Sequence, residues 1–243
     1  MSHQYRIGRL LLLAAVFTCA QPVFADDEQL SKELTTLFRS GRKVISDNQA
    51  MINDASKGDK GLSSTNVLNT TKSNFKAATG SELTMGGDGA KAKEAMLKAI
   101  REVMDDAQTL INEQGKGFKG FLPAVFARRV AEKFSTTMAG QMKIKLTAPK
   151  ELLRNRANRA DEWENNIIES KFKIASYEKG KAFAENGTVD GKPAYRYILP
   201  EYYGESCLSC HGEPKGETDI TGGKKEGYKL GDLGGAVSFV LFK

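Results

Sequence analysis

A pentapeptide, Cys207-Leu208-Ser209-Cys210-His211, constrains this chain more than any other stretch. Two thiols three positions apart with an imidazole directly after them form the pattern through which a c-type haem is attached. Each Cys sulfur can add to one vinyl group of the porphyrin, and the His can reach the iron as a neutral nitrogen donor. The pattern predicts one covalently bound haem c, with Cys207 and Cys210 as thioether sites and His211 as an axial ligand.

The rest of the Cys and His inventory strengthens this interpretation. The chain has three Cys and two His, and the remaining two, Cys19 and His3, lie in an N-terminal stretch that we expect to be removed. A structural zinc site uses four protein ligands, and no fourth Cys or His would then be available. A disulfide between the two thiols is the lesser alternative in an exported chain. The Gly- and Pro-rich sequence after His211 argues against a thioredoxin-like site and a four-helix cytochrome.

Residues 1–25 have the organisation of a secretory signal peptide. Arg6 and Arg9 precede an apolar run at 10–20, and cleavage is expected after Ala25. Since the run is shorter than the roughly 20 residues that span a bilayer, an uncleaved anchor is the lesser alternative. A lipoprotein attached through Cys19 is weaker still. We expect residues 26–243 to be exported to the periplasm or an equivalent compartment, with no membrane segment after cleavage.

The charge pattern gives no indication of a nucleic-acid partner. Without the leader the formal net charge falls from +6 to +4, and the Lys residues are scattered among Glu and Asp. A mildly basic surface is typical of a solvated protein, although it could also favour an acidic redox partner. No Ser/His/Asp grouping is available once His211 is committed, and a peroxidase needs a distal acid/base, usually a further His, that this sequence would then lack. The sequence therefore does not indicate an enzyme.

Hydrophobic periodicity predicts helices in the first part of the chain and strands in the last part. Helices are expected over 28–54, 64–78, 90–112, 123–139 and 148–172. Strands are expected over 141–147, 182–185, 194–199 and 236–242, with turns at Asn186-Gly187 and Asp190-Gly191. No internal repeat is evident. This order is typical of the α+β class, with the haem loop inserted between two antiparallel strands.

Four stretches carry a resemblance to a known family. They are FKGFLPAVFARRVAEKF (118–134), KLTAPKELLRNRAN (145–158), ILPEYYGESCLSCHGEPKGETDITGGKKEGYKLGDLGGAVS (198–238) and, more weakly, NQAMIND (48–54). In these stretches the chain resembles the exported PAS-like domains that carry a single c-type haem, a group described mainly as a domain of unknown function. The resemblance implies a five-stranded antiparallel sheet with the haem against it and a long N-terminal helix. It implies the same roles for Cys207, Cys210 and His211.

The expected organisation is a helical segment at 26–117 packed on a PAS-like c-haem domain at 118–243, the two forming one structural unit. The leading functional interpretation is redox or small-ligand sensing, with a signalling partner protein and a diatomic gas as the candidate ligand. The alternative is a periplasmic electron carrier of the cytochrome c type with a redox partner. The sequence has no kinase or methyl-accepting segment, so a sensor would pass its state to another protein.

The sequence does not fix the ligand on the far side of the iron. Some relatives supply a sulfur ligand there, but both thiols of the motif are committed to the porphyrin. Met138 and Met142 are the candidate sulfur donors, although Met at such positions more often packs in the core. An open or water-occupied position, a Lys or another neutral donor are the alternatives.

Other side chains could hold the porphyrin. Arg128 and Arg129 could bind its propionates through charge-assisted hydrogen bonds, or they could face water. Four Tyr residues close to the motif in sequence could form its wall: Tyr195, Tyr197, Tyr202 and Tyr203. Sheet packing explains the first two equally well. The segment 222–227 lacks the Gly-Lys-Ser/Thr ending of a phosphate loop, so we expect it to pack over the haem edge.

Overall fold

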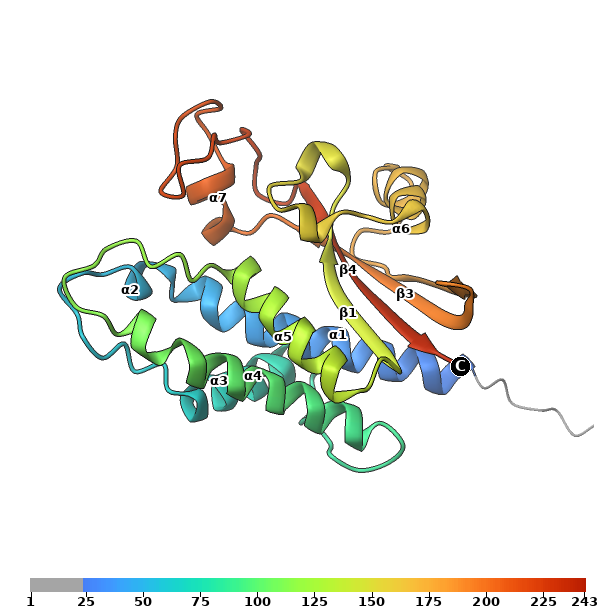
Figure 1. Ribbon diagram of the computed structural model, residues 1–243. Helices are drawn as coiled ribbons and strands as arrows, with labels where there is room; N and C mark the ends of the chain where they lie inside the picture. Colours follow the sequence, from blue (N-terminus) through green and yellow to red (C-terminus); the bar gives the residue numbers. More distant parts are fainter. Residues whose placement is uncertain (1–23) are drawn as a thin grey trace, which may run out of the picture.

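Four long helices form one layer of the structure, and an antiparallel sheet forms the other (Figure 1). The structure, a computed structural model, describes residues 24–243. The predicted signal peptide, with Cys19 and His3, therefore lies almost entirely outside the described residues. The helices are α1 (Phe24–Asp47), α2 (Gln49–Ile52), α3 (Ser64–Thr79), α4 (Ala90–Ile111), α5 (Pro123–Thr137), α6 (Glu162–Ile167) and α7 (Glu205–His211). The strands are β1 (Met142–Thr147), β2 (Phe183–Val189), β3 (Lys192–Tyr202) and β4 (Leu233–Phe242).

The ends of the long helices follow from local sequence. The Ser63 side chain accepts a hydrogen bond from the backbone N–H of Asn66 and so caps the start of α3. Gly80 ends the same helix in the left-handed conformation, with φ of 75°. Pro123 occupies the first turn of α5, where its missing N–H costs no helical hydrogen bond. The helix predictions for 64–78, 90–112 and 123–139 are therefore confirmed within one or two residues.

The helical layer contains an internal repeat. Residues 51–62 (MINDASKGDKGL) and 110–121 (LINEQGKGFKGF) share an Ile-Asn-acid triplet and a Lys-Gly-x-Lys-Gly run at the same spacing. Each segment begins with the last two residues of a helix, α2 or α4, and the next helix begins three residues after its last Gly, at Ser64 and at Pro123. The expectation of no internal repeat was wrong, because outside these twelve residues the helices keep the buried positions but few of the residue types.

The two copies bind each other reciprocally through their Asn residues. The Asn53 Oδ1 atom accepts from the backbone N–H of Lys119, and the Asn112 Oδ1 atom accepts from the backbone N–H of Lys60, each at 3.0 Å. Both Lys residues are buried, and each ammonium group donates to two carbonyl oxygens of its own loop. Each buried charge is thus hydrogen-bonded within its own copy, while the copies are joined through backbone N–H groups.

A second reciprocal pair of hydrogen bonds joins the two copies, from residues one helical turn before Asn53 and Asn112. The Gln49 Nε2 atom donates to the carbonyl of Phe121, and the Gln108 Nε2 atom donates to the carbonyl of Leu62, again at 3.0 Å each. Gln49 and Gln108 occupy equivalent positions in the two copies, as do Leu62 and Phe121. The layer therefore consists of two helical hairpins, α1–α3 and α4–α5, that contact each other through reciprocal hydrogen bonds.

The sheet has the strand order β1-β4-β3-β2, with every neighbouring pair antiparallel. The α+β class is confirmed, but the described residues form four strands where the resemblance implied five. The β2–β3 turn lies at Asp190-Gly191, which have φ of 52° and 74°, as the Asp-Gly signal predicts. The prediction of a turn at Asn186-Gly187 is wrong, because both residues lie in β2 and pair with β3.

The segment 148–172, expected as one helix, is broken into shorter pieces. It contains short 3-10 turns at Lys150–Leu152 and Arg156–Asn158, then α6, then a π-helical turn at Ile168–Phe172. Asp161 starts α6 in a capping box with Glu164, which defines a new helix start inside the predicted one.

Each face of the sheet packs against a different element. On one face, Tyr197, Leu199 and Phe239 share a core with the long helices, and on the other, Ile198 and Ala236 pack against the π-helical turn. Helix α5 packs on α4, β1 and α1, so it joins the two layers. The expected boundary at 117/118 lies in the loop before this helix. Between residues 24 and 243 no helix has both the length and the hydropathy to span a membrane.

We predict that Asn53→Ala and Asn112→Ala lower the free energy of unfolding by similar amounts, about 1–3 kcal/mol each, because each leaves a buried backbone N–H without its acceptor. Chemical denaturation of the two variants measures this cost. Asn69→Ala, at an exposed position of α3, is the matched control and should change stability little. A large loss for only one of the two variants would show that the copies are not equivalent.

Candidate functional site

The motif predicted from the sequence lies on α7, a short helix at one end of the sheet (Figure 1). Glu201, near the end of β3, forms ion pairs with Arg39 and Arg42 of α1. Further along, the Ser206 hydroxyl lies 2.7 Å from the Ser46 hydroxyl of the same helix. The motif is therefore held against the first helical hairpin through polar contacts.

Cys207 and Cys210 are both free thiols and both partly exposed. Because residues three apart on a helix lie on the same side, the two sulfur atoms belong to one face of α7. The helix ends at His211, and Gly212 turns the chain away. A Cβ atom at Gly212 would lie 2.5 Å from the Leu208 carbonyl oxygen, so the close approach of the backbone requires glycine there.

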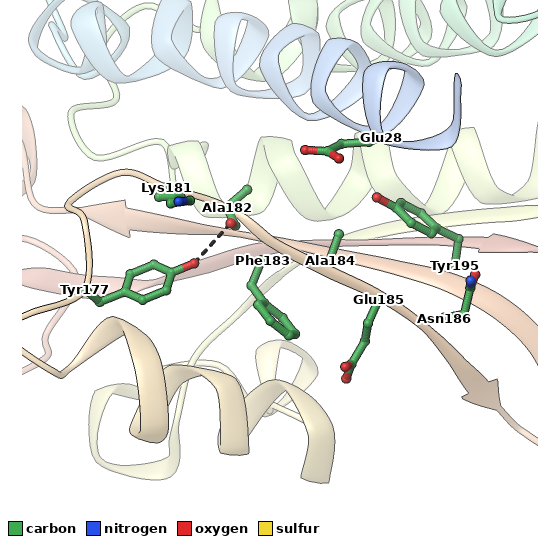
Figure 2. Close-up of a pocket in the computed structure, with 9 residues that line it drawn as sticks. All are labelled: Glu28, Tyr177, Lys181, Ala182, Phe183, Ala184, Glu185, Asn186 and Tyr195. Carbon is green, nitrogen blue, oxygen red and sulfur yellow. Dashed lines mark hydrogen bonds between the residues drawn. The ribbon is translucent and has the colours of Figure 1, made fainter. Parts of the chain in front are cut away.

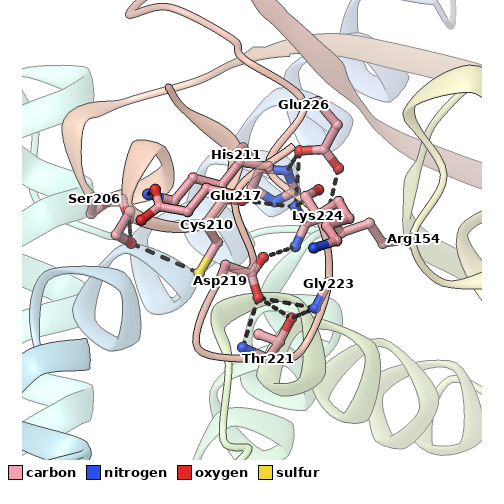
Figure 3. A network of polar contacts seen from close by, with 12 residues as sticks. Arg154, Ser206, Cys210, His211, Glu217, Asp219, Thr221, Gly223, Lys224 and Glu226 are labelled. Atoms are coloured by element: carbon pink, nitrogen blue, oxygen red, sulfur yellow. Dashed lines mark hydrogen bonds and ion pairs between the residues drawn. The ribbon is translucent and has the colours of Figure 1, made fainter. Parts of the chain in front are cut away.

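The His211 ring is held by Glu226, whose Oε2 atom lies 2.9 Å from Nδ1 (Figure 3). Burial lowers the pKa of His211 below its ordinary value of 6.5, and the charge of Arg154 lowers it further, although Glu226 partly opposes this. The imidazole is thus neutral near pH 7, and the carboxylate places its proton on Nδ1. Nε2 therefore carries the lone pair, and it makes no hydrogen bond to residues 24–243.

Arg154 is the second hydrogen-bond partner of Glu226. Its Nε and Nη2 atoms bind the two Glu226 oxygens at 2.6 and 2.9 Å, and its Nη1 atom binds Asp219 at 2.5 Å. The Nη2 atom also donates to the carbonyl of Cys210 at 2.7 Å. Although burial opposes it, hydrogen bonds from Arg154 and His211 lower the pKa of Glu226. Glu226 is therefore an anion that accepts from both neighbours.

Two Tyr rings form a wall beside His211. The Tyr203 and His211 ring centroids are 5.0 Å apart, and Tyr203 stacks on Tyr228 at 4.8 Å. Burial raises the pKa of Tyr203, which keeps its hydroxyl protonated. The backbone N–H of Tyr228 donates to the carbonyl of His211 at 2.9 Å, so the loop after the motif folds back over it.

A sequence model of the Tll0287-like family matches residues 87–241, more than half of the chain. The chain belongs to the Tll0287-like family. The matched range begins just before α4 and contains the second helical hairpin, the sheet and the motif. No curated protein and no solved structure matched the chain.

In this Tll0287-like chain, Tyr195 and Tyr197 are not brought to the motif. Both are buried in the core between β3 and the helices, and burial raises the pKa of each hydroxyl to about 12. At about 3.3 Å per strand residue, Tyr197 lies roughly 16 Å from Tyr202, the last residue of β3. Of the four Tyr residues considered from the sequence, Tyr203 is the one whose ring lies against His211.

The two candidate Met ligands lie at the opposite end of the sheet from α7. Met142 opens β1 and pairs with Leu241, whereas the end of β1 nearer the motif is Thr147. Met138 is buried in the core at the end of α5. Their positions fit core packing, which the sequence already favoured for Met residues.

Neither Arg128 nor Arg129 contacts the motif in the described residues. Arg128 pairs with Glu132 one turn further along α5 at 2.8 Å, and Arg129 is half-buried on the same helix. Their position in the middle of α5 gives no support to the propionate role.

Arg154 and Glu226 are site residues that were not predicted from the sequence. Both lie inside stretches that carry the family resemblance, 145–158 and 198–238, which is the only signal that could have marked them. The partners are 72 residues apart, so neither periodicity nor motif spacing connects them.

A separate pocket of about 490 Å³ lies beside β2 (Figure 2). Its lining includes Tyr177, Lys181, Glu185 and Tyr195, together with Glu28 of α1. No residue of the motif lines it. Within residues 24–243, the motif included, no group of three or more His, Cys, Asp and Glu side chains is arranged so that it could hold a metal ion.

Asp219 should give the site a measurable acid sensitivity. Burial alone would raise the pKa of Asp219, but hydrogen bonds from Thr221 and Arg154 outweigh it and lower the pKa from 3.8 to about 2. Since the folded pKa lies below the unfolded one, this stabilisation is complete above pH 3.8 and is lost as the pH falls toward 2. In Asp219→Asn, the free energy of unfolding should therefore fall less steeply with acid over this range than in the wild type.

The measurement is urea denaturation at several pH values from about 5 down to 2, applied to both proteins. Asp105→Asn, on an exposed part of α4, tests whether loss of any carboxylate has the same effect. Identical slopes for wild type and Asp219→Asn would contradict the assignment.

Proposed function

We propose that this protein binds one haem c covalently through Cys207 and Cys210, with His211 as an axial iron ligand, and acts in redox or small-ligand sensing. The observation that carries the proposal is the arrangement of His211. Its Nδ1 atom is engaged by a carboxylate and its Nε2 atom is free, directly after two free thiols on one helix face. A metal-bound His commonly donates its other ring N–H to a carboxylate in this way.

The residues of the site fit such a group in three respects. The thiols are accessible enough to react, the imidazole is neutral, and aromatic rings of Tyr203 and Tyr228 offer an apolar wall. When bound, a haem supplies one-electron redox chemistry and, where an axial position is free, binding of a diatomic gas. The chain's own residues anchor the group, orient His211 and exclude water from one side of its ring.

The PAS-like interpretation and an exported location belong to the same proposal. Four antiparallel strands with helices on both faces support the first, and the sequence of residues 1–25 supports the second. A sensor of this kind transmits its state to a signalling protein. We therefore place its partner outside this chain.

Electron transfer is the second candidate, and it is favoured by the exposure of the motif. Cys207, Cys210 and His211 are all partly exposed on a short helix at one end of the sheet. A redox partner could therefore approach a haem edge there without a change in the fold. Sensing is favoured instead by the distance of Met138 and Met142 from the motif, since neither lies where it could fill a second axial position.

We expect the exported protein, produced with a c-type haem assembly system, to give a c-type pyridine haemochrome spectrum that is retained after acid-acetone extraction. Cys207→Ser together with Cys210→Ser should release the colour to the solvent, because no thioether bond can form. Ser209→Ala, between the two thiols, is the matched control and should keep the haem. A wild-type protein that loses all its colour on extraction would refute covalent attachment.

Carbon monoxide distinguishes the two functions. If the protein senses small ligands, the reduced form should bind CO readily and shift its Soret band, because one axial position is open or weakly held. If it carries electrons with two firm ligands, the reduced spectrum should be unchanged by CO. Spectra recorded with and without CO decide between them.

A further inference from the structure

The Arg154 guanidinium has a position in the site that haem attachment alone does not require. It comes from the segment between β1 and α6 and reaches residues 56 to 72 positions away in sequence. It binds both oxygens of Glu226, one oxygen of Asp219 and the carbonyl of Cys210. A single side chain therefore touches both the carboxylate that holds His211 and the backbone of one thioether position (Figure 3).

The Glu226 oxygens are shared unequally between two donors. Oε1 accepts from Arg154 alone, whereas Oε2 accepts from Arg154 at 2.9 Å and faces His211 Nδ1 at 2.9 Å. A carboxylate that already binds a bidentate guanidinium has part of its charge compensated. It therefore draws the Nδ1 proton less strongly than an unpaired carboxylate would.

The strength of that hydrogen bond controls how much electron density His211 can give through Nε2. A stronger acceptor at Nδ1 gives the imidazole more imidazolate character and makes it a stronger donor to a metal. A stronger donor stabilises the oxidised iron and lowers the reduction potential. Arg154, by competing for Glu226, acts in the opposite direction.

We propose that Arg154 is a positioning residue that raises the reduction potential of the bound haem by limiting the pull of Glu226 on the Nδ1 proton of His211. This inference rests on the proposed haem attachment. It assigns regulation of the potential to a residue whose hydrogen bonds go to Glu226, Asp219 and backbone carbonyls, and not to the His211 ring or to either sulfur. Lys could not replace it fully, because an ammonium group lacks the planar fork that binds both oxygens of one carboxylate.

The experiment is a redox titration of the holoprotein at pH 7 with dithionite and ferricyanide, in the presence of mediators, for four proteins. Arg154→Gln should lower the midpoint potential, because Glu226 then interacts with His211 alone. Glu226→Gln should raise it, because an amide oxygen is a weaker acceptor. In the double variant the Arg154→Gln change should have little further effect, because the carboxylate through which Arg154 acts is gone.

The double variant separates this mechanism from simple electrostatics. If the lost positive charge acted on the iron by electrostatics alone, it would lower the potential whether or not Glu226 is present, so an Arg154→Gln shift of equal size in both backgrounds would overturn the proposal. Lys224→Gln is the matched control, since it removes a nearby positive charge whose ammonium group binds Thr218 and not Glu226. It should give a smaller shift than Arg154→Gln.

Resonance Raman spectroscopy of the reduced protein gives a second readout. Where one axial position of the reduced iron is open, as the sensing proposal expects, the iron–histidine stretching frequency should rise in Arg154→Gln and fall in Glu226→Gln, and unchanged frequencies would contradict the mechanism. If Arg154→Gln does not hold haem, Arg154→Lys is the substitute. It keeps the positive charge without the planar fork and should also lower the midpoint potential. A wild-type protein without covalent haem refutes the proposed function, whereas a normal holoprotein with additive potentials refutes only this inference.

Discussion

The contact between Arg154 and Glu226 is the interaction on which the site depends. It joins the segment after β1 to the loop before β4, and these flank the helix that carries the thiols. Without it Glu226 would lose the donor that fixes both of its oxygens, and His211 would lose a partner of defined position. Asp219 secures the same guanidinium from the opposite side, so its orientation does not depend on one ion pair. An exposed ion pair contributes little to stability, but here the partly buried geometry sets the direction of an imidazole.

Local sequence signals predicted local structure well. The starts of α3 and α5 and the turn at Asp190-Gly191 follow from a capping Ser, a first-turn Pro and an Asp-Gly pair. The motif was found in the same way, because its residues are adjacent in the chain. Arg154 and Glu226 could not be found, since their pairing depends on how β1 and β4 bring distant segments together. The turn prediction at Asn186-Gly187 was wrong for a related reason, because pairing with β3 outweighs the weak turn preference of these two residues.

The two hairpins share an internal repeat but make different contacts with the site. Each loop donates a backbone N–H to the Asn side chain of the other copy, so the two loops contact each other in the same way. The helices are freer to vary. Arg39 and Ser46 of α1 contact the polypeptide around α7, while Lys98 and Asp105, at the equivalent positions of α4, do not. The first hairpin, α1–α3, thus supports the site through Arg39 and Ser46.

The position of β4 has a consequence for the order in which the protein can be completed. β4 lies between β1 and β3, and both take their backbone partners from residues 233–242. A chain made from its N-terminus has the whole helical layer available long before this strand exists. The thiols on α7 are therefore synthesised while the sheet beside them still lacks its middle strand.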